Sequence, residues 1–96
     1  MFCLRGLIIK GIFERDGITP KESHQYRVSR IGKDVTLEIG FPMFFEYLDG
    51  YGTLITSNVI DYQEDDYGVW VTTRNTIYRL DDYVDKNQNT EEEMVF

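Results

Sequence analysis

Residues 69–80 read VWVTTRNTIYRL, two runs of β-branched and aromatic residues on either side of Arg74-Asn75. Such runs favour strands, and asparagine tolerates the positive φ that tight primed turns require. The segment therefore predicts a β-hairpin with a two-residue loop, in which the guanidinium of Arg79 can stack on the indole of Trp70. The expected cross-strand pairs are Thr73 with Thr76, Val71 with Tyr78, Val69 with Leu80, and Trp70 with Arg79.

The alternation of apolar and polar residues in this hairpin recurs along the chain and indicates a predominantly β protein. Turn residues such as Asp16-Gly17 and Asp49-Gly50 supply the reversals between most of the segments. We therefore predict an all-β fold, a small barrel or two-sheet sandwich of about six antiparallel strands, with room for one short helix. The expected strands cover residues 7–13, 25–31, 35–39, 53–63, 69–73 and 76–81.

Residues 41–48, with the sequence FPMFFEYL, depart from this alternation because large apolar residues follow one another. Pro42 can open a helix at its first turn, or it can bend a strand. We favour a short helical turn or an irregular plug that closes one end of the barrel, and a bent strand is the alternative.

A chain of 96 residues fits one domain and leaves no room for a second core. We expect residues 1–84 to form a single β domain. Residues 85–96 contain Asn, Gln, Thr and three consecutive glutamates with little to bury, so they predict a mobile acidic C-terminal tail. A domain of this size buries only about two thirds of the surface of its unfolded chain, so deep internal pockets are not expected.

The cysteine count and the N-terminal segment bear on the compartment. Cys3 is the only cysteine, which excludes an intramolecular disulfide framework and favours a reducing environment. Arg5 and Lys10 interrupt the apolar run at the N-terminus, so that run predicts neither a signal sequence nor a membrane span. We expect a cytoplasmic protein that does not bind membranes.

Residue types that carry chemistry are scarce. His24 is the only histidine and lies in a polar stretch typical of an exposed loop, whereas Cys3 fits a small buried hydrophobe better than a reactive thiol. One Cys and one His are too few for a structural zinc site, and residues 85–89 match only the first five positions of an EF-hand loop. We therefore predict that the protein is not an enzyme and has no catalytic residue, cofactor or metal.

Charge is unevenly distributed along a chain whose formal net charge is -7. Up to Gly40 there are seven basic and five acidic residues, whereas from Phe41 onward there are three basic and twelve acidic residues. An acidic surface repels the phosphate backbone and attracts basic proteins. The sequence therefore predicts a basic protein partner and no direct binding of nucleic acid.

Tyrosine stands one or two residues after a carboxylate at five places in the acidic part of the chain. Tyrosine offers rigid contact area with a hydrogen-bonding tip, and carboxylates match arginine and lysine, so this pattern suits a protein interface. The frequent use of tyrosine in strands and aspartate in turns would produce the same coincidence. The candidate partner-binding residues are Glu46, Tyr47, Asp49, Tyr51, Asp61, Tyr62, Glu64, Asp65, Asp66, Tyr67, Asp81, Asp82 and Tyr83.

Residues 53–60 (TLITSNVI), followed by residues 69–80, resemble a strand and hairpin pattern of small uncharacterised β proteins from Gram-positive bacteria, their phages and mobile elements. That group includes anti-CRISPR-type inhibitors of host nucleases, some of which imitate the charge of nucleic acid. The resemblance implies an inhibitor that docks on a nucleic-acid-handling protein of phage or host.

We therefore predict a non-enzymatic binding protein whose acidic, tyrosine-bearing surface docks on a basic protein such as a nuclease. The alternative is a structural or assembly accessory protein that self-associates through sheet edges, which would allow a homodimer. A third hypothesis is a small barrel that binds a small molecule, with residues 41–48 as its lid.

Overall fold

The computed structural model describes residues 2–4 and 6–83, and these form seven β-strands and one short 3-10 helix. The predicted tail, residues 85–96, lies outside the described residues. The elements are β1 (Phe2–Leu4), β2 (Leu7–Phe13), η1 (Glu22–Arg27), β3 (Ile31–Leu37), β4 (Pro42–Tyr47), β5 (Thr53–Glu64), β6 (Gly68–Thr73) and β7 (Ile77–Asp82).

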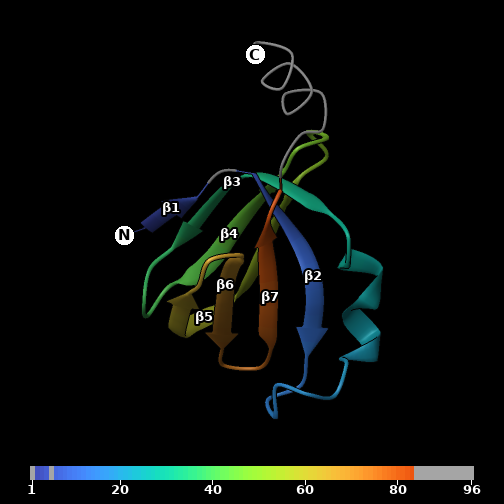
Figure 1. Ribbon diagram of the computed structural model, residues 1–96, viewed down its shortest axis with the longest axis vertical. Helices are drawn as coiled ribbons and strands as arrows, with labels where there is room; N and C mark the ends of the chain where they lie inside the picture. The colour runs from blue at the N-terminus through green and yellow to red at the C-terminus, as the bar shows by residue number, and fades with distance from the viewer. Residues whose placement is uncertain (1, 5, 84–96) are drawn as a thin grey trace.

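The strands confirm the predicted all-β class and resolve it as a closed antiparallel barrel. From β2 to β7 each strand pairs with the next one in the chain, and β7 returns to pair with β2. β1 and β2 both pair with β3, one after the other. Phe2 pairs with Leu37 and Leu7 with Gly32, so the two strands share one continuous register. Figure 1 shows β6, β7 and β2 side by side at the front of the barrel, with η1 next to β2.

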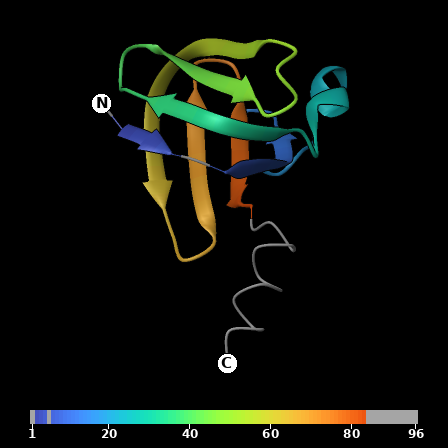
Figure 2. The ribbon, with the colours of Figure 1, turned by 90° about the horizontal axis from the view of Figure 1, so that it is seen from above.

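Irregularities in the ladders bend the strands enough to close the ring. The register shifts between Ile9 and Gly11 on β2 and between Val59 and Asp61 on β5. An extra residue in one strand increases its bend and twist. The first half of β5 pairs with β4 and the second half with β6, and Figure 2 shows this strand curving around one side of the barrel.

The barrel interior is filled by alternate residues of each strand, as the period of two requires. β6 illustrates this, because Val69 and Val71 are buried while Trp70 between them is 39% exposed. The largest fully buried apolar side chains are Phe45, Leu7, Ile9, Ile12, Leu37, Met43, Leu80, Val35, Val59, Val69 and Val71.

The predicted strand at residues 25–31 is wrong. Its first three residues belong to η1, and β3 begins at Ile31. A hydrogen bond from Val28 N to Gln25 O at 3.0 Å closes a helical turn here, and Gln25 Nε2 donates to Ile12 O on β2 at 3.0 Å. Hydrogen bonds within the turn and to β2 therefore prevail over the β preference of the individual residues, a preference that is expressed only against a neighbouring strand.

The favoured helical turn at residues 41–48 is also wrong, because residues 42–47 form strand β4. Phe45 points into the barrel and its ring lies against the backbone of Gly32, where an added Cβ would stand 2.7 Å from Cζ. Phe44 points outward and is 43% exposed. Residues of this run alternate between the interior and the exterior of the barrel. Because apolar side chains occur on both faces, the sequence does not show the alternation of apolar and polar residues that marks a strand.

The β6–β7 hairpin has the predicted register. Val71 pairs with Tyr78 and Trp70 with Arg79, whose Cζ lies 5.4 Å from the centre of the indole. The predicted primed turn is wrong, because neither Arg74 nor Asn75 has a positive φ.

Candidate protein-binding surface

The fold brings two of the predicted acidic segments together. In the β6–β7 ladder Gly68 pairs with Asp81, and Asp82 N donates a 2.8 Å hydrogen bond to Tyr67 O. The β5–β6 turn therefore lies beside the end of β7. We call this region the acidic corner, and its residues are Glu64, Asp65, Asp66, Tyr67, Asp81, Asp82 and Tyr83. Asp61 lies outside it, because it pairs with Thr72 toward the other end of β6.

Asp65 organises the turn at the acidic corner. Its Oδ1 accepts hydrogen bonds from the backbone N–H groups of Tyr67 at 2.8 Å and Gly68 at 3.0 Å. Arg79 donates to both carboxylate oxygens, at 2.8 and 3.0 Å. The hydrogen bonds from Arg79, followed by that from Tyr67 N–H, lower the pKa of Asp65 from 3.8 to about 2.

Arg79 is held from three directions on the outer face of β7. Besides Asp65, its Nε donates a 2.6 Å hydrogen bond to Asp81, and its guanidinium lies over Trp70. The hydrogen bonds with Asp65 contribute most to raising the pKa of Arg79 above its ordinary value. Phe13 packs on the indole with a ring-centre distance of 5.8 Å. Trp70 is therefore held in place next to the acidic corner while part of its ring stays exposed.

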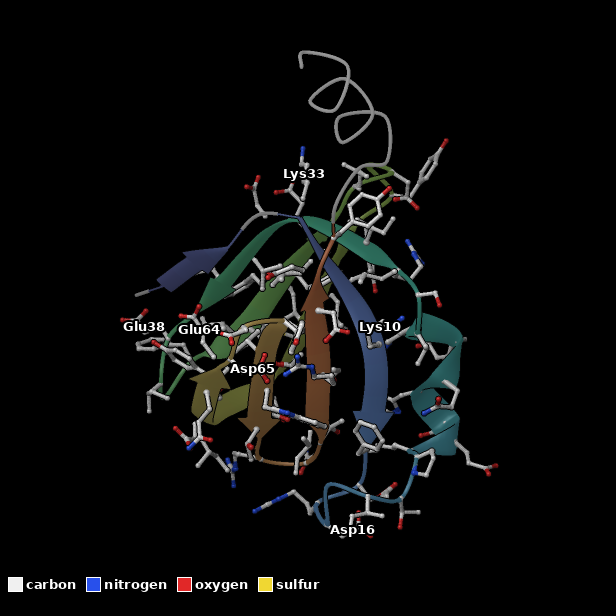
Figure 3. The ribbon with its side chains drawn as sticks, in the orientation of Figure 1. Lys10, Asp16, Lys33, Glu38, Glu64 and Asp65 are labelled. Carbon is white, nitrogen blue, oxygen red and sulfur yellow. The ribbon has the colours of Figure 1, made fainter. Side chains whose placement is uncertain are left out.

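Three carboxylates of the corner remain available to a partner. Glu64, Asp66 and Asp82 are exposed, and the described residues give none of them an ion pair or a side-chain hydrogen bond. Figure 3 shows Glu64 and Asp65 at the end of β5 beside β6. Asp65 and Asp81, by contrast, are already partly neutralised by Arg79.

The tyrosines of these segments differ in exposure. Tyr67 is 75% exposed at the turn and Tyr83 is 38% exposed just after β7. Tyr62 is half-buried and packs against the core. The corner therefore presents two tyrosine rings beside its free carboxylates.

The third predicted segment, from Glu46 to Tyr51, lies elsewhere, at the end of β4 and in the turn before β5. Tyr47 is buried, with the guanidinium of Arg30 3.8 Å from the centre of its ring. Glu46 pairs with Lys33 at 3.4 Å and Asp49 with Arg30 at 3.1 Å. Tyr51 is highly exposed in the turn. This segment therefore offers a partner one tyrosine and carboxylates that already have cationic neighbours.

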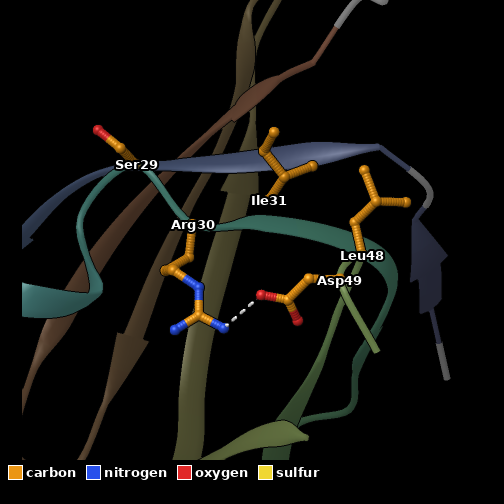
Figure 4. A pocket seen from close by; sticks show the side chains of 5 residues that line it. All are labelled: Ser29, Arg30, Ile31, Leu48 and Asp49. Carbon is orange, nitrogen blue, oxygen red and sulfur yellow. Dashed lines mark hydrogen bonds and ion pairs between the residues drawn. The ribbon is translucent and has the colours of Figure 1, made fainter. Parts of the chain in front are cut away.

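A shallow hollow of about 290 Å³ lies beside this turn, lined by Ser29, Arg30, Ile31, Leu48 and Asp49 (Figure 4). It is at the lower end of the size range of small-molecule sites. Its two charged groups are paired with each other, which leaves little polar chemistry to orient a ligand.

Among the described residues outside the corner, the side chains that could carry chemistry form no reaction centre. Ser23 Oγ lies 2.8 Å from Nδ1 of His24 on η1, but no described residue bonds the other ring nitrogen to orient the imidazole as a catalytic triad requires. Burial, with Arg27 and Lys21 nearby, lowers the pKa of His24. Within residues 2–4 and 6–83, no three His, Cys, Asp or Glu side chains are grouped to hold a metal ion.

Sequence reasoning did not identify the capping role of Asp65. The signal for that role was present, since an aspartate followed three residues later by glycine is typical of a turn that the carboxylate caps. Sequence reasoning relied on the number of acidic residues, so it treated Asp65 and Asp66 as equivalent candidates for partner binding.

No helix in the described part of the chain is long and apolar enough to cross a lipid bilayer. The fold and the surface define a small all-β barrel with an acidic corner. No family model, curated protein or solved structure shows significant similarity to the chain.

Proposed function

We propose that the protein is a non-enzymatic binding module that docks its acidic corner on a basic protein surface. The observation that carries the proposal is the convergence of residues 64–67 and 81–83, which are separate in sequence but adjacent at the β5–β6 turn. Convergence concentrates free carboxylates and exposed tyrosines on one part of the barrel, as an interface to arginine and lysine would need.

The rigidity of the corner supports this function. Asp65 and Arg79 fix the turn, so Asp66 and Tyr67 are presented with little backbone freedom to lose on binding. Trp70, which lies beside them and is partly exposed, belongs to the residue type most enriched among interface hot spots. Charge then steers the encounter, and the aromatic rings prolong the complex.

A nucleic-acid-handling protein, such as a nuclease of phage or host, is the partner class that we propose. Such proteins carry basic surfaces that normally meet phosphates, and the free carboxylates of the corner can occupy the same surface. The protein would then act in the cytoplasm as an inhibitor that imitates nucleic-acid charge.

The proposal can be tested with three baits in parallel capture experiments from a host lysate. The baits are the unaltered chain, Glu64→Lys with Asp66→Lys, and a control with Glu14→Lys and Glu22→Lys. Each substitution adds two positive charges, so both variants change the formal net charge from -7 to -3. We expect basic proteins to be captured by the unaltered chain and the control and lost from the corner variant. Equal losses from the two variants would mean that total charge, and not the corner, governs capture.

A further inference from the structure

The outer face of β6 carries the only tryptophan of the chain, Trp70, at a position that the barrel interior does not use. Its neighbours Val69 and Val71 are buried, whereas 39% of Trp70 is exposed. The register places Gln63 of β5 on one side of Trp70 and Arg79 of β7 on the other. Trp70 therefore lies in the middle of a row that crosses three strands on the outside of the barrel.

A glycine on β2 allows a second aromatic ring to pack against the indole. Gly11 pairs with Arg79, and a Cβ at Gly11 would stand 2.6 Å from two ring carbons of Phe13. The ring of Phe13 therefore lies over the backbone of Gly11, with its centre 5.8 Å from that of the indole. An aromatic side chain that is already held in place loses little conformational freedom on binding, which suits a contact residue of an interface.

Exposed carboxylates lie on both sides of this row along β5. Asp61 pairs with Thr72, two residues from Trp70 on β6, so both lie on the outer face. The acidic corner begins at Glu64, three residues after Asp61, which is about 10 Å along a strand. Asp61 is exposed, and no described residue forms an ion pair with it, Arg74 in the neighbouring turn included.

The cations near this face limit its extent. The guanidinium of Arg79 is paired with Asp65 and Asp81, so it adds no net positive charge at the centre. Lys10 has no ion pair among the described residues and lies in the bulge of β2 (Figure 3). A basic partner therefore meets carboxylates on the β5 side of Trp70 and a like charge on the β2 side.

We propose that the docking surface continues from the acidic corner along the outer face of β5 and β6 to Asp61, with Trp70 as its central contact. This inference rests on the proposed function, since the occupant is the same basic protein. The partner that fits places an apolar side chain against the exposed part of the indole and has arginine or lysine side chains on both sides of it. An aromatic contact surrounded by polar groups is the usual anatomy of an interface hot spot.

A dye-labelled synthetic peptide, RRGLGRR, is the probe for this surface. In an extended peptide the two inner arginines and the leucine between them share one face, and the arginines are about 13 Å apart. Fluorescence anisotropy at low salt measures the dissociation constant. The peptide RRGGGRR keeps the charges but lacks the leucine, so it should bind about fivefold more weakly.

Variants of the full chain locate the contact. Asp61→Asn should raise the dissociation constant of RRGLGRR about threefold and Trp70→Ala about tenfold. In Trp70→Ala the two peptides should bind equally, a result that a general loss of stability would not produce, since it would weaken both. Glu22→Gln on η1 removes the same charge as Asp61→Asn away from this face and should leave the dissociation constant unchanged.

The outcomes separate this inference from the proposed function. If Glu64→Gln with Asp66→Asn weakens binding while Asp61→Asn and Trp70→Ala do not, the extension to Asp61 is overturned and the acidic corner stands by itself. Equal binding of the two peptides to the unaltered chain, or no binding of either, also overturns the extension. The capture experiment with the corner variant tests the proposed function independently of these peptides.

Discussion

Asp65 shows how one exposed side chain can organise a surface turn. Its carboxylate accepts hydrogen bonds from two backbone N–H groups and from Arg79, which in turn lies over Trp70. If Asp65 only supplied negative charge to a partner, another carboxylate nearby could do the same. The hydrogen bonds that Asp65 accepts instead require a short side chain with acceptor oxygens and no donor. The neighbouring Asp66 makes none of these contacts among the described residues and is available for binding.

The stability of the protein should therefore depend on Asp65 in acid. The folded-state pKa of about 2 lies below the ordinary value of 3.8. The ionised carboxylate favours the folded state, and its contribution is complete above about pH 4 and is lost as the pH falls toward 2. Asp65→Asn should lower the thermal midpoint at neutral pH and flatten its dependence on pH in this window. Asp66→Asn is the control and should reproduce the unaltered profile.

Trp70 should contribute less to stability than a core aromatic residue. It is 39% exposed and contacts Phe13 and Arg79 on the outside of the barrel. Trp70→Ala should lower the free energy of unfolding by about 1–2 kcal/mol, below the 3–5 kcal/mol typical of a fully buried tryptophan. Urea denaturation measures this difference, and a loss at the upper end of the buried range would show that the indole belongs to the core.

At the scale of the element, β4 provides a matched pair of phenylalanines. Phe45 is fully buried against Gly32, whereas its neighbour Phe44 faces outward. Phe45→Ala should lower the free energy of unfolding by about 3–5 kcal/mol, and Phe44→Ala by less than about 1 kcal/mol. Equal losses in urea denaturation would contradict a strand at residues 42–47, because the two side chains would then share one environment.

The elements that sequence reasoning recovered are those whose partners lie nearby in the chain. The β6–β7 hairpin was predicted with its register because a two-residue loop fixes which residues oppose each other. The turn type was missed because the Thr73 hydroxyl bonds both Thr76 O and Thr76 N, at 2.8 and 3.1 Å, and Arg74 N donates to Asn58 O on β5. The Thr73–Thr76 hydrogen bonds are local, but the bond to Asn58 comes from a distant part of the chain and leaves no mark on a local pattern.

Long-range features explain the other differences. Residues 25–31 have β-forming side chains, but the backbone of residues 22–27 forms η1 and Gln25 reaches back to β2. Of the candidate partner-binding residues, those at 64–67 and 81–83 meet at the β5–β6 turn, whereas Asp61 lies farther along β5 and Tyr47 enters the core. Only closure of the barrel decides which of the tyrosine–acid pairs face solvent.

At the scale of the whole molecule, closure of the barrel brings together acidic segments that are far apart in the sequence. The acidic corner lies around the β5–β6 turn and the end of β7.

The most direct test of the acidic corner is the rate of association with a purified basic partner at two ionic strengths. Three chains are compared: the unaltered protein, Glu64→Lys with Asp66→Lys, and the charge-matched control Glu14→Lys with Glu22→Lys. Asp65 and Asp81 are left intact because Arg79 needs both. Thermal midpoints establish first that all three chains are equally folded.

At low salt the corner variant should associate about tenfold more slowly than the unaltered chain, and its rate should depend less on ionic strength, because local charge steers the encounter. The control should lose little speed, although its net charge is the same. If the corner variant and the control associate at the same rate, the acidic corner is not the docking surface.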